Sequence, residues 1–170
     1  MTINNIYLNM KQFLLLLTII SLFGCAHVIS KEMRDKAYGE PPASALFKDP
    51  DEFKGRIVIL GGTIVSSTNT DKGTYIEVLQ KPLDYHGRPE DTDTSYGRFI
   101  IFHDGYLDAA VYAQGRDVTV AGEVMGKELH PLGEIQYPYP LIKSKELHLF
   151  EARYNMPVHF GIGIGIWHSF

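Results

Sequence analysis

The chain has 170 residues, of which 45% are hydrophobic and 12% aromatic, and its formal net charge at pH 7 is −4. This length and composition predict a single globular domain with a sizeable core. Residues 1–24 hold one charged residue, Lys11, and removing it takes Lys+Arg from 16 to 15 against 20 acidic residues, a balance of −5. The acidic excess excludes a surface built for nucleic acid, which needs clustered Lys and Arg.

The first predicted element is a signal peptide over residues 1–24. Lys11 provides a basic start, residues 13–23 form an apolar run, and the small residue Gly24 follows. This order is typical of a secretory signal. The run is shorter than the roughly 20 apolar residues that a transmembrane helix needs. Two methionines are candidates for the true start, Met1 and Met10.

The only cysteine, Cys25, is predicted to be the lipidation site, with signal cleavage between Gly24 and Cys25. A thiol at the first mature position can be alkylated by a lipid donor, and the small Gly24 leaves the bond before it accessible to a peptidase. The alternative is an ordinary signal peptide followed by a free cysteine. A lone cysteine in an exported protein would then have no disulfide partner.

The four residues Leu22-Phe23-Gly24-Cys25 resemble the bacterial lipobox, and Phe23 is a departure because small or β-branched residues are more usual there. In resembling lipoproteins, a residue other than aspartate after the cysteine, here Ala26, implies an outer-membrane address. Acyl chains contribute about 0.8 kcal/mol per buried CH₂, so several chains would make the membrane a stable partner.

Residues 25–42 are charged and then proline-rich, and we predict a lipid-anchored tether with one helical turn after Ser30. A packed N-terminal helix is the alternative. Residues 43–151 are predicted to form the folded domain, beginning with a short helix over 42–47 that has Pro42 near its first position. Residues 152–170 form a Gly/Ile-rich C-terminal tail.

Alternating or continuous apolar residues predict five strands in the domain. The expected strands cover residues 56–65, 74–79, 98–102, 118–124 and 145–151. The pair Gly61-Gly62 inside the first strand predicts a bulge or sharp bend. We expect a hairpin loop at 66–73 and a short helix at 107–114 ending at Gly115.

Two further loops are expected, a polar and acidic one at 87–95 and one at 126–140 that carries Tyr137-Pro138-Tyr139-Pro140. The resulting order is three strands, a short helix and two strands. It predicts a mainly β fold, a small five-stranded OB-like barrel with one or two short helices, and the alternative is a β-sandwich.

The tail alternates glycine and isoleucine over residues 161–166 before Trp167. As a strand it would have one apolar face and one bare face, and an exposed apolar strand tends to find a partner. We therefore expect either a contact with membrane or with an envelope protein partner, or a poorly ordered tail or added edge strand.

Several segments together resemble the Slp family of outer-membrane lipoproteins. The matching segments are 53–62, 81–84, 97–99, 105–108, 115–122 and 137–140. With the lipobox, the resemblance covers roughly residues 23–151 and leaves the tail outside. Its motifs are mainly turn and strand glycines. It implies a lipid-anchored envelope protein, linked in some members to starvation or stationary phase, and it brings no catalytic residues.

Candidate chemistry in the sequence is sparse. No histidine forms a tight ligand pair of the kind that holds zinc, so no metal or cofactor is expected. The seven histidines are His27, His86, His103, His130, His148, His159 and His168. His103-Asp104 is the best acid–base pair by proximity, but neighbours on a strand point to opposite faces.

Other candidates are weaker. Ser66 and Ser67 lack a nucleophile-elbow context, and Asp91 and Asp93 lack a full calcium-ligand series. The tyrosines either include an aromatic ligand patch or serve packing alone. They are Tyr75, Tyr85, Tyr96, Tyr106, Tyr112, Tyr137 and Tyr139.

These observations predict a non-catalytic lipoprotein of the cell envelope with a structural or stress-related role. It would be anchored in the outer membrane of a Gram-negative bacterium, with its domain on the periplasmic side. The alternative is a periplasmic OB-like module that binds a small molecule, glycan or peptide in a concave, tyrosine-lined cleft.

Overall fold

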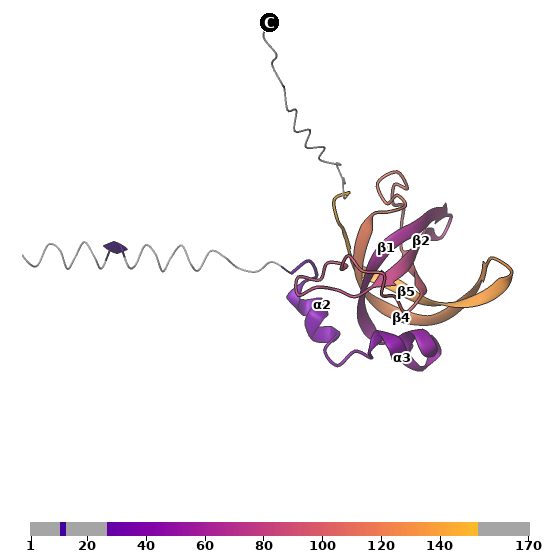
Figure 1. Ribbon diagram of the computed structural model, residues 1–170, viewed down its shortest axis with the longest axis horizontal. Helices are drawn as coiled ribbons and strands as arrows, with labels where there is room; N and C mark the ends of the chain where they lie inside the picture. Colours follow the sequence, from indigo (N-terminus) through magenta and orange to yellow (C-terminus); the bar gives the residue numbers. More distant parts are fainter. Residues whose placement is uncertain (1–10, 13–26, 153–170) are drawn as a thin grey trace, which may run out of the picture.

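The computed structural model describes residues 11–12 and 27–152, and residues 27–152 hold the folded domain (Figure 1). These residues form a closed sheet with short helices beside it. The strands are β1 (Ile57–Thr70), β2 (Gly73–Lys81), β3 (Arg98–His103), β4 (Asp117–Leu132) and β5 (Ile135–Leu149). The helices are α2 (Lys31–Lys36), α3 (Ala43–Lys48) and the 3₁₀ turn η1 (Pro50–Phe53).

The five strands close in a ring in the order β1-β2-β3-β5-β4. β3 and β5 run parallel, and all other neighbouring strands are antiparallel. The prediction of a mainly β fold with a closed five-stranded sheet and two short helices is confirmed, and the sandwich alternative is excluded.

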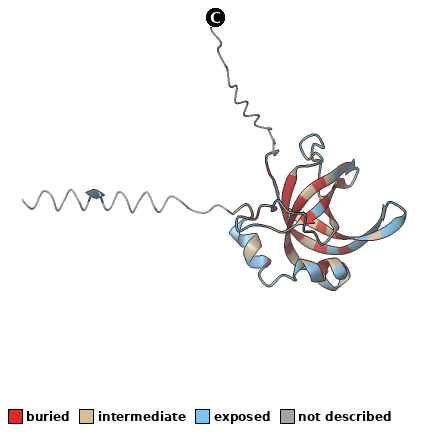
Figure 2. Ribbon diagram, viewed as in Figure 1, coloured by how far each residue is buried: buried red, intermediate tan, exposed pale blue. Residues whose placement is uncertain are grey.

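The core lies inside the ring and takes buried side chains from every strand. Buried positions recur along the strands in Figure 2. The alternation predicted for β2 is confirmed, because Ile76 and Val78 are buried while Tyr75 and Glu77 lie on the outer face. Leu46 of α3 joins this core with no exposed surface. The ring of Phe47 meets Phe99 edge-on at 6.3 Å, which fastens α3 to β3.

Gly61 and Gly62 permit a close approach of strands. An added Cβ at Gly62 would lie 1.9 Å from the Leu79 carbonyl oxygen. At this point β1 pairs with β2 on one edge and with β4 on the other. The register shift in β1 falls instead between Ile64 and Ser66, so the bulge expected at the double glycine was placed too early.

Two of the expected loops were wrong because strands continue through them. β1 extends to Thr70, so most of the loop expected at 66–73 is strand. Residues 126–140 form the far half of the β4–β5 hairpin. Beyond the barrel the two strands pair only with each other, since β1 pairs with β4 only up to Glu123 and β3 with β5 only from Leu141. Prolines are tolerated there because a missing N–H can face an unpaired edge.

The helix expected at 107–114 was also wrong. Residues 108–112 make one turn, in which the amides of Val111 and Tyr112 donate to the Asp108 carbonyl. The Asp108 carboxylate accepts from the Ala110 amide, a local bond that competes with helix continuation. Gly115 does end the segment, with a φ of 85° that favours glycine.

The segment expected as a tether packs on the barrel in its described part. Ile29 has no exposed surface, and the Val28 amide donates to the His86 carbonyl at 3.0 Å. Ser30 caps α2 by accepting from the Met33 amide, and both its amide and its hydroxyl donate to Glu146. Residues 31–36 form the helix α2, which has no buried residue and is held beside the barrel through its N-cap Ser30.

Candidate functional site: a cleft between two hairpins

A cleft of about 570 Å³ lies on the outer face of the barrel, between the end of the β1–β2 hairpin and the β4–β5 hairpin. The β4–β5 hairpin extends past the barrel (Figure 1), and residues of both hairpins line the cleft, with the sheet between them as its floor. The lining residues are Ser66, Thr68, Thr70, Asp71, Lys72, Tyr75, Glu77, Ile100, Glu128, His130, Pro131 and Tyr139.

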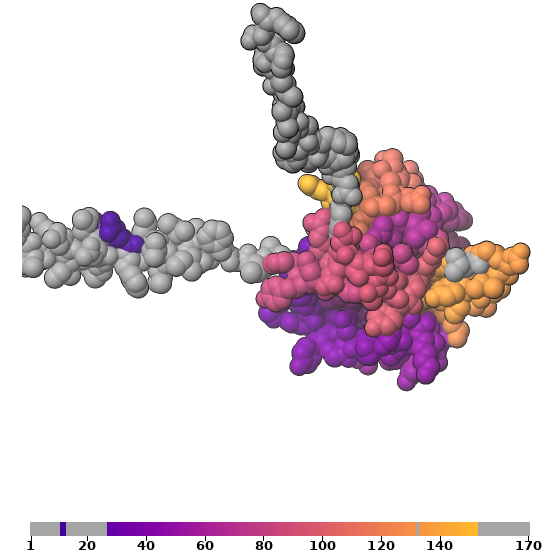
Figure 3. All heavy atoms as spheres, viewed as in Figure 1, coloured from indigo at the N-terminus to yellow at the C-terminus, as the bar shows by residue number. Residues whose placement is uncertain are grey.

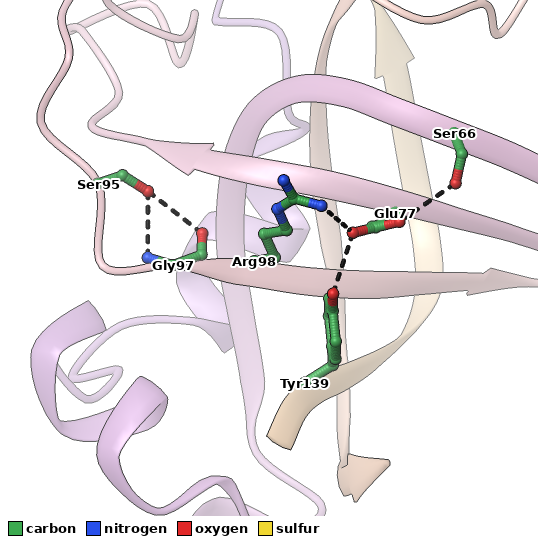
Figure 4. Close-up of polar contacts among 6 residues, drawn as sticks. All are labelled: Ser66, Glu77, Ser95, Gly97, Arg98 and Tyr139. Atoms are coloured by element: carbon green, nitrogen blue, oxygen red, sulfur yellow. Dashed lines mark hydrogen bonds and ion pairs between the residues drawn. The ribbon is translucent and has the colours of Figure 1, made fainter. Parts of the chain in front are cut away.

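The floor is organised by the carboxylate of Glu77, which accepts three hydrogen bonds from three other strands (Figure 4). Arg98 of β3 donates to it at 2.7 Å, the Tyr139 hydroxyl of β5 at 3.1 Å, and the Ser66 hydroxyl of β1 at 3.3 Å. Glu77 thus ties together the floor and both walls of the cleft.

This arrangement shifts the pKa of two of the partners. Burial, followed by the negative charge of Glu77, raises the pKa of the Tyr139 hydroxyl. The hydrogen bond to Glu77 raises the pKa of the Arg98 guanidinium. Both groups are hydrogen-bond donors at neutral pH, so this part of the floor is a hydrogen-bonding frame around the Glu77 carboxylate.

The start of β3, which carries Arg98, is held by a tight local turn. The Ser95 hydroxyl accepts from the Gly97 amide at 3.1 Å and donates to the Gly97 carbonyl at 3.2 Å (Figure 4). The Gly97 carbonyl also accepts from the Gln80 amide at 3.0 Å. These bonds fix the direction in which Arg98 enters the sheet.

The wall formed by β4 and β5 carries an aromatic group of three. His130 meets the Tyr139 ring edge-on at 5.6 Å, and Tyr137 meets Tyr139 at 5.2 Å. The Nε2 atom of His130 lies 2.9 Å from a carboxylate oxygen of Glu128. On the opposite side Tyr75 packs against Phe102 with ring centroids 4.9 Å apart.

The cleft combines aromatic rings, hydroxyls and both signs of charge. Thr68, Thr70, Asp71 and Lys72 are exposed along the β1–β2 wall, while Tyr75 is half-buried. Such a lining suits the binding of a polar ligand, with rings for stacking and hydroxyls for hydrogen bonds. Among residues 27–152, no group of three or more His, Cys, Asp and Glu is placed to hold a metal ion.

The predicted lipidation and cleavage residues, Gly24 and Cys25, lie outside the described residues. The same holds for His159 and His168 and for the Gly/Ile tail from residue 153 onward.

The described candidates for acid–base or nucleophilic chemistry do not converge. Nδ1 of His103 lies 2.9 Å from the Ser144 hydroxyl, while Asp104 pairs with Lys143 at 2.8 Å. The Ser67 hydroxyl donates to the Tyr112 carbonyl, away from Ser66. His27 and His86 lie at the other end of the barrel, His148 packs against Phe150, and Asp91 and Asp93 are exposed.

The tyrosines divide between the cleft and other surfaces. Tyr75 and Tyr139 line the cleft, and Tyr137 packs behind Tyr139. The remaining four lie elsewhere: Tyr85, Tyr96, Tyr106 and Tyr112. Two of the seven tyrosines thus line the cleft, and the ligand-binding role expected of such a patch stays a prediction.

Sequence reasoning missed Glu77, Glu128 and the Thr68–Lys72 wall as site residues. The alternation in β2 did place Tyr75 and Glu77 on one outer face. The partners of Glu77 were hidden because residue 139 was assigned to a loop.

In the part of the chain that the structure describes, no helix is long and apolar enough to cross a membrane. A family model described as the outer membrane lipoprotein Slp family matches residues 22–165, so the match reaches into the tail that the resemblance was expected to leave outside.

Two curated relatives are similar over part of their length. An uncharacterized protein of Haemophilus influenzae is 30% identical over 105 residues, covering 60% of this chain and 57% of the relative. The uncharacterized lipoprotein YeaY of Escherichia coli K12 is 29% identical over 94 residues, covering 55% and 48%. The chain thus spans about half the length of the curated relatives it matches.

Among solved structures, a similar one is Schizosaccharomyces pombe Pot1pC bound to single-stranded DNA. It is 7% identical with a TM-score of 0.34, covering 60% of this chain and 84% of Pot1pC. A likeness at this level carries no argument about function.

Proposed function

Because the chain belongs to the outer membrane lipoprotein Slp family, we propose that acyl chains on Cys25 hold it in the outer membrane of a Gram-negative bacterium. The observation that carries this proposal is where the family match begins. It starts at residue 22, the first residue of the Leu22–Cys25 motif, and runs on through the whole barrel. The motif and the barrel thus form one family unit.

Fractionation of cells tests the anchor. The native protein is expected in the outer-membrane fraction, and Cys25→Ser is expected to leave it, because the variant has no thiol to acylate. Ser30→Ala, also near the start of the mature chain, is the matched control and should stay in the membrane. Cys25→Ser remaining in the outer membrane would overturn the proposal.

We further propose that the barrel is non-catalytic and serves the envelope in a structural or stress-related role, facing the periplasm. Support comes from the polar groups of the described site, which are engaged with one another. Glu77 accepts three internal hydrogen bonds, and His103 and Asp104 have separate partners. The link to starvation and a contact through the C-terminal tail remain predictions.

The cleft favours a second function, a binding module for a hydroxyl-rich ligand such as a glycan. Its aromatic Tyr75, its threonine hydroxyls and the acidic Asp71 and Glu128 are the groups that sugar rings and hydroxyls use. Glu77, whose oxygens are already engaged, would shape the site rather than bind directly.

Titration of the detergent-solubilised protein with soluble peptidoglycan glycan strands tests this binding. Tyr75→Ala is expected to weaken binding about 5- to 10-fold, the equivalent of a lost stacking contact of about 1 kcal/mol. Tyr106→Ala is the matched control, since Tyr106 is exposed outside the cleft. Equal binding by both variants, or no binding by the native protein, would contradict the proposal that the cleft binds a glycan.

A further inference from the structure

The described chain begins packed against one end of the barrel. Nδ1 of His27 accepts from the Ile29 amide at 3.1 Å, and the Val28 amide donates to the His86 carbonyl at 3.0 Å. Ile29 is fully buried, and its carbonyl accepts from Arg34 at 2.7 Å. From residue 27 onward, the chain therefore has no free length between its start and the folded domain.

The loop that receives this segment, residues 84–88, is a rigid turn. The Asp84 carboxylate accepts from the amides of His86 and Arg88 at 2.9 and 2.8 Å. The Gly87 carbonyl accepts from the buried Thr119 hydroxyl, and Arg88 lies over the Phe150 ring at 4.8 Å. The loop is thus fastened to β4 and to the end of β5.

Covalent geometry places this loop close to the acylated residue. One residue, Ala26, lies between Cys25 and His27. An extended chain spans at most about 3.6 Å per residue, so His27 is within roughly 7 Å of Cys25 and Val28 within roughly 11 Å. The headgroup layer on each side of the hydrocarbon core is about 5–8 Å thick. A domain fastened at this distance cannot stand clear of the bilayer.

Tyr85 stands at the tip of the same loop and is 81% exposed. A tyrosine ring has an apolar body and a polar hydroxyl, which suits the boundary between acyl chains and water. Within the adjacent helix α2, Lys31 pairs with Asp35 and Lys36 with Glu32, while Arg34 donates to the Ile29 carbonyl. The helix therefore carries one positive charge in excess, which is compatible with an anionic lipid surface.

We infer that residues 27–30 and 84–88 form a membrane-contact face, on which the barrel rests directly against the lipid headgroups with Tyr85 among them. This rests on the acylation of Cys25 proposed above. The occupant of the face is the bilayer that holds the protein's own acyl chains. No flexible tether holds the domain away from it.

The inference also sets the direction of the cleft. β2 runs from Gly73 beside the cleft toward Lys81 and the 84–88 loop, and β5 runs from Ile135 toward Phe150 beneath Arg88. Of the two hairpins that line the cleft, the β4–β5 hairpin extends away from the side of the barrel where the described chain begins. In Figures 1 and 3 the described chain begins beside α2 at the left, and the β4–β5 hairpin extends to the right.

Fluorescence quenching in vesicles tests the face. The full acylated protein is reconstituted in phosphatidylethanolamine–phosphatidylglycerol vesicles that contain headgroup spin-labelled lipid. Tyr85→Cys is labelled with an environment-sensitive nitrobenzoxadiazole dye, and acylated Cys25 offers no competing thiol. Lys72→Cys, exposed at the far end of the β1–β2 hairpin, is the matched control.

Quenching several-fold stronger at position 85 than at position 72 is the expected result. Weak and equal quenching at both positions, in a protein whose mass shows acyl chains, would overturn the membrane-contact face and leave the anchor intact. A mass without acyl chains would remove the anchor and the face together, so the two failures are distinguishable.

Discussion

Glu77 holds the candidate site together by joining side chains from four strands. Its carboxylate accepts from Arg98, Tyr139 and Ser66, and Tyr139 is only 2% exposed. A buried hydroxyl that loses its acceptor carries a desolvation penalty. The stability of the cleft floor therefore depends on this one acceptor more than on any single donor.

Replacing Glu77 should cost more than replacing one of its donors. Glu77→Ala is expected to lower the free energy of unfolding by about 1–3 kcal/mol because it strands Arg98 and Tyr139, and Tyr139→Phe by about 0.5–1.5 kcal/mol. Urea unfolding monitored by circular dichroism measures both. Glu134→Ala, in the exposed hairpin turn, is the control near zero. A Glu77→Ala cost no larger than this control would contradict the role of Glu77.

Gly62 is the residue at which the barrel tolerates least change. Gly62→Ala would place a methyl group 1.9 Å from the Leu79 carbonyl oxygen and 2.9 Å from Val78 Cγ1, so the β1–β2 pairing must shift. We expect a loss of about 3 kcal/mol or more in unfolding free energy. Thermal and urea unfolding measure the loss.

Gly133→Ala separates crowding from backbone strain. Gly133 has a φ of 62° and open space around it, so its substitution should cost only the roughly 1–2 kcal/mol of a left-handed conformation. Similar losses at positions 62 and 133 would show that close strand approach is not what Gly62 provides.

For single residues, the sequence predicts which face of a strand a side chain lies on better than it predicts which side chains it contacts. The alternation in residues 74–79 places Glu77 and Tyr75 on the outer face, as the structure has them. It cannot predict that Tyr139, 62 positions away, reaches Glu77, because that contact depends on how the ring closes.

Among the elements, the β4–β5 hairpin departs most from sequence expectation. Pro131, Pro138 and Pro140 argued for a loop, since proline removes a ladder donor. The far half of the hairpin lies outside the closed ring, where each strand has an unpaired edge that tolerates proline. Local composition does not distinguish a free hairpin arm from a loop, and the cleft wall was missed for this reason.

One ion-pair group ties this hairpin to η1. The Asp51 carboxylate lies 2.9 Å from Lys54 Nζ and 3.0 Å from Lys127 Nζ of β4. The hydrogen bonds from Lys54 and then Lys127 lower the pKa of Asp51 to about 2 from an ordinary value of 3.8. A lowered pKa means that the folded state favours the ionised form.

The contribution of the Asp51 ion pairs to the stability of the fold should therefore be lost in acid. It is present above the ordinary pKa of 3.8 and is lost as the pH falls through about 2. Asp51→Asn is expected to show a small decrease in melting temperature at neutral pH that closes near pH 2. Because the group is exposed, salt should also reduce the difference.

Glu52→Gln, on the neighbouring exposed residue, serves as the control for Asp51. It should show no such pH dependence. A melting difference for Asp51→Asn that stays constant from neutral pH to about pH 2 would contradict the ion-pair account.

For the whole molecule, the closed five-stranded ring could be predicted because strand order, period-2 patterns and turn glycines agree with one another. The packing of residues 28–30 against the barrel could not be predicted from the sequence. Residues 28–42 are polar by composition, and only the burial of Ile29 and the Ser30–Glu146 bonds reveal that they pack. This packing supports the inferred seating of the domain against the bilayer.

The most direct test concerns the acylation of Cys25, on which the outer-membrane anchor and the membrane-contact face both depend. It compares the intact mass of the protein extracted from membranes with that of the Cys25→Ser variant. The account predicts a native mass that begins at Cys25 and carries acyl chains, and a variant mass without them. An unacylated native mass would contradict the account. The Phe23 departure from the lipobox would then have prevented processing, leaving a periplasmic protein with a free thiol.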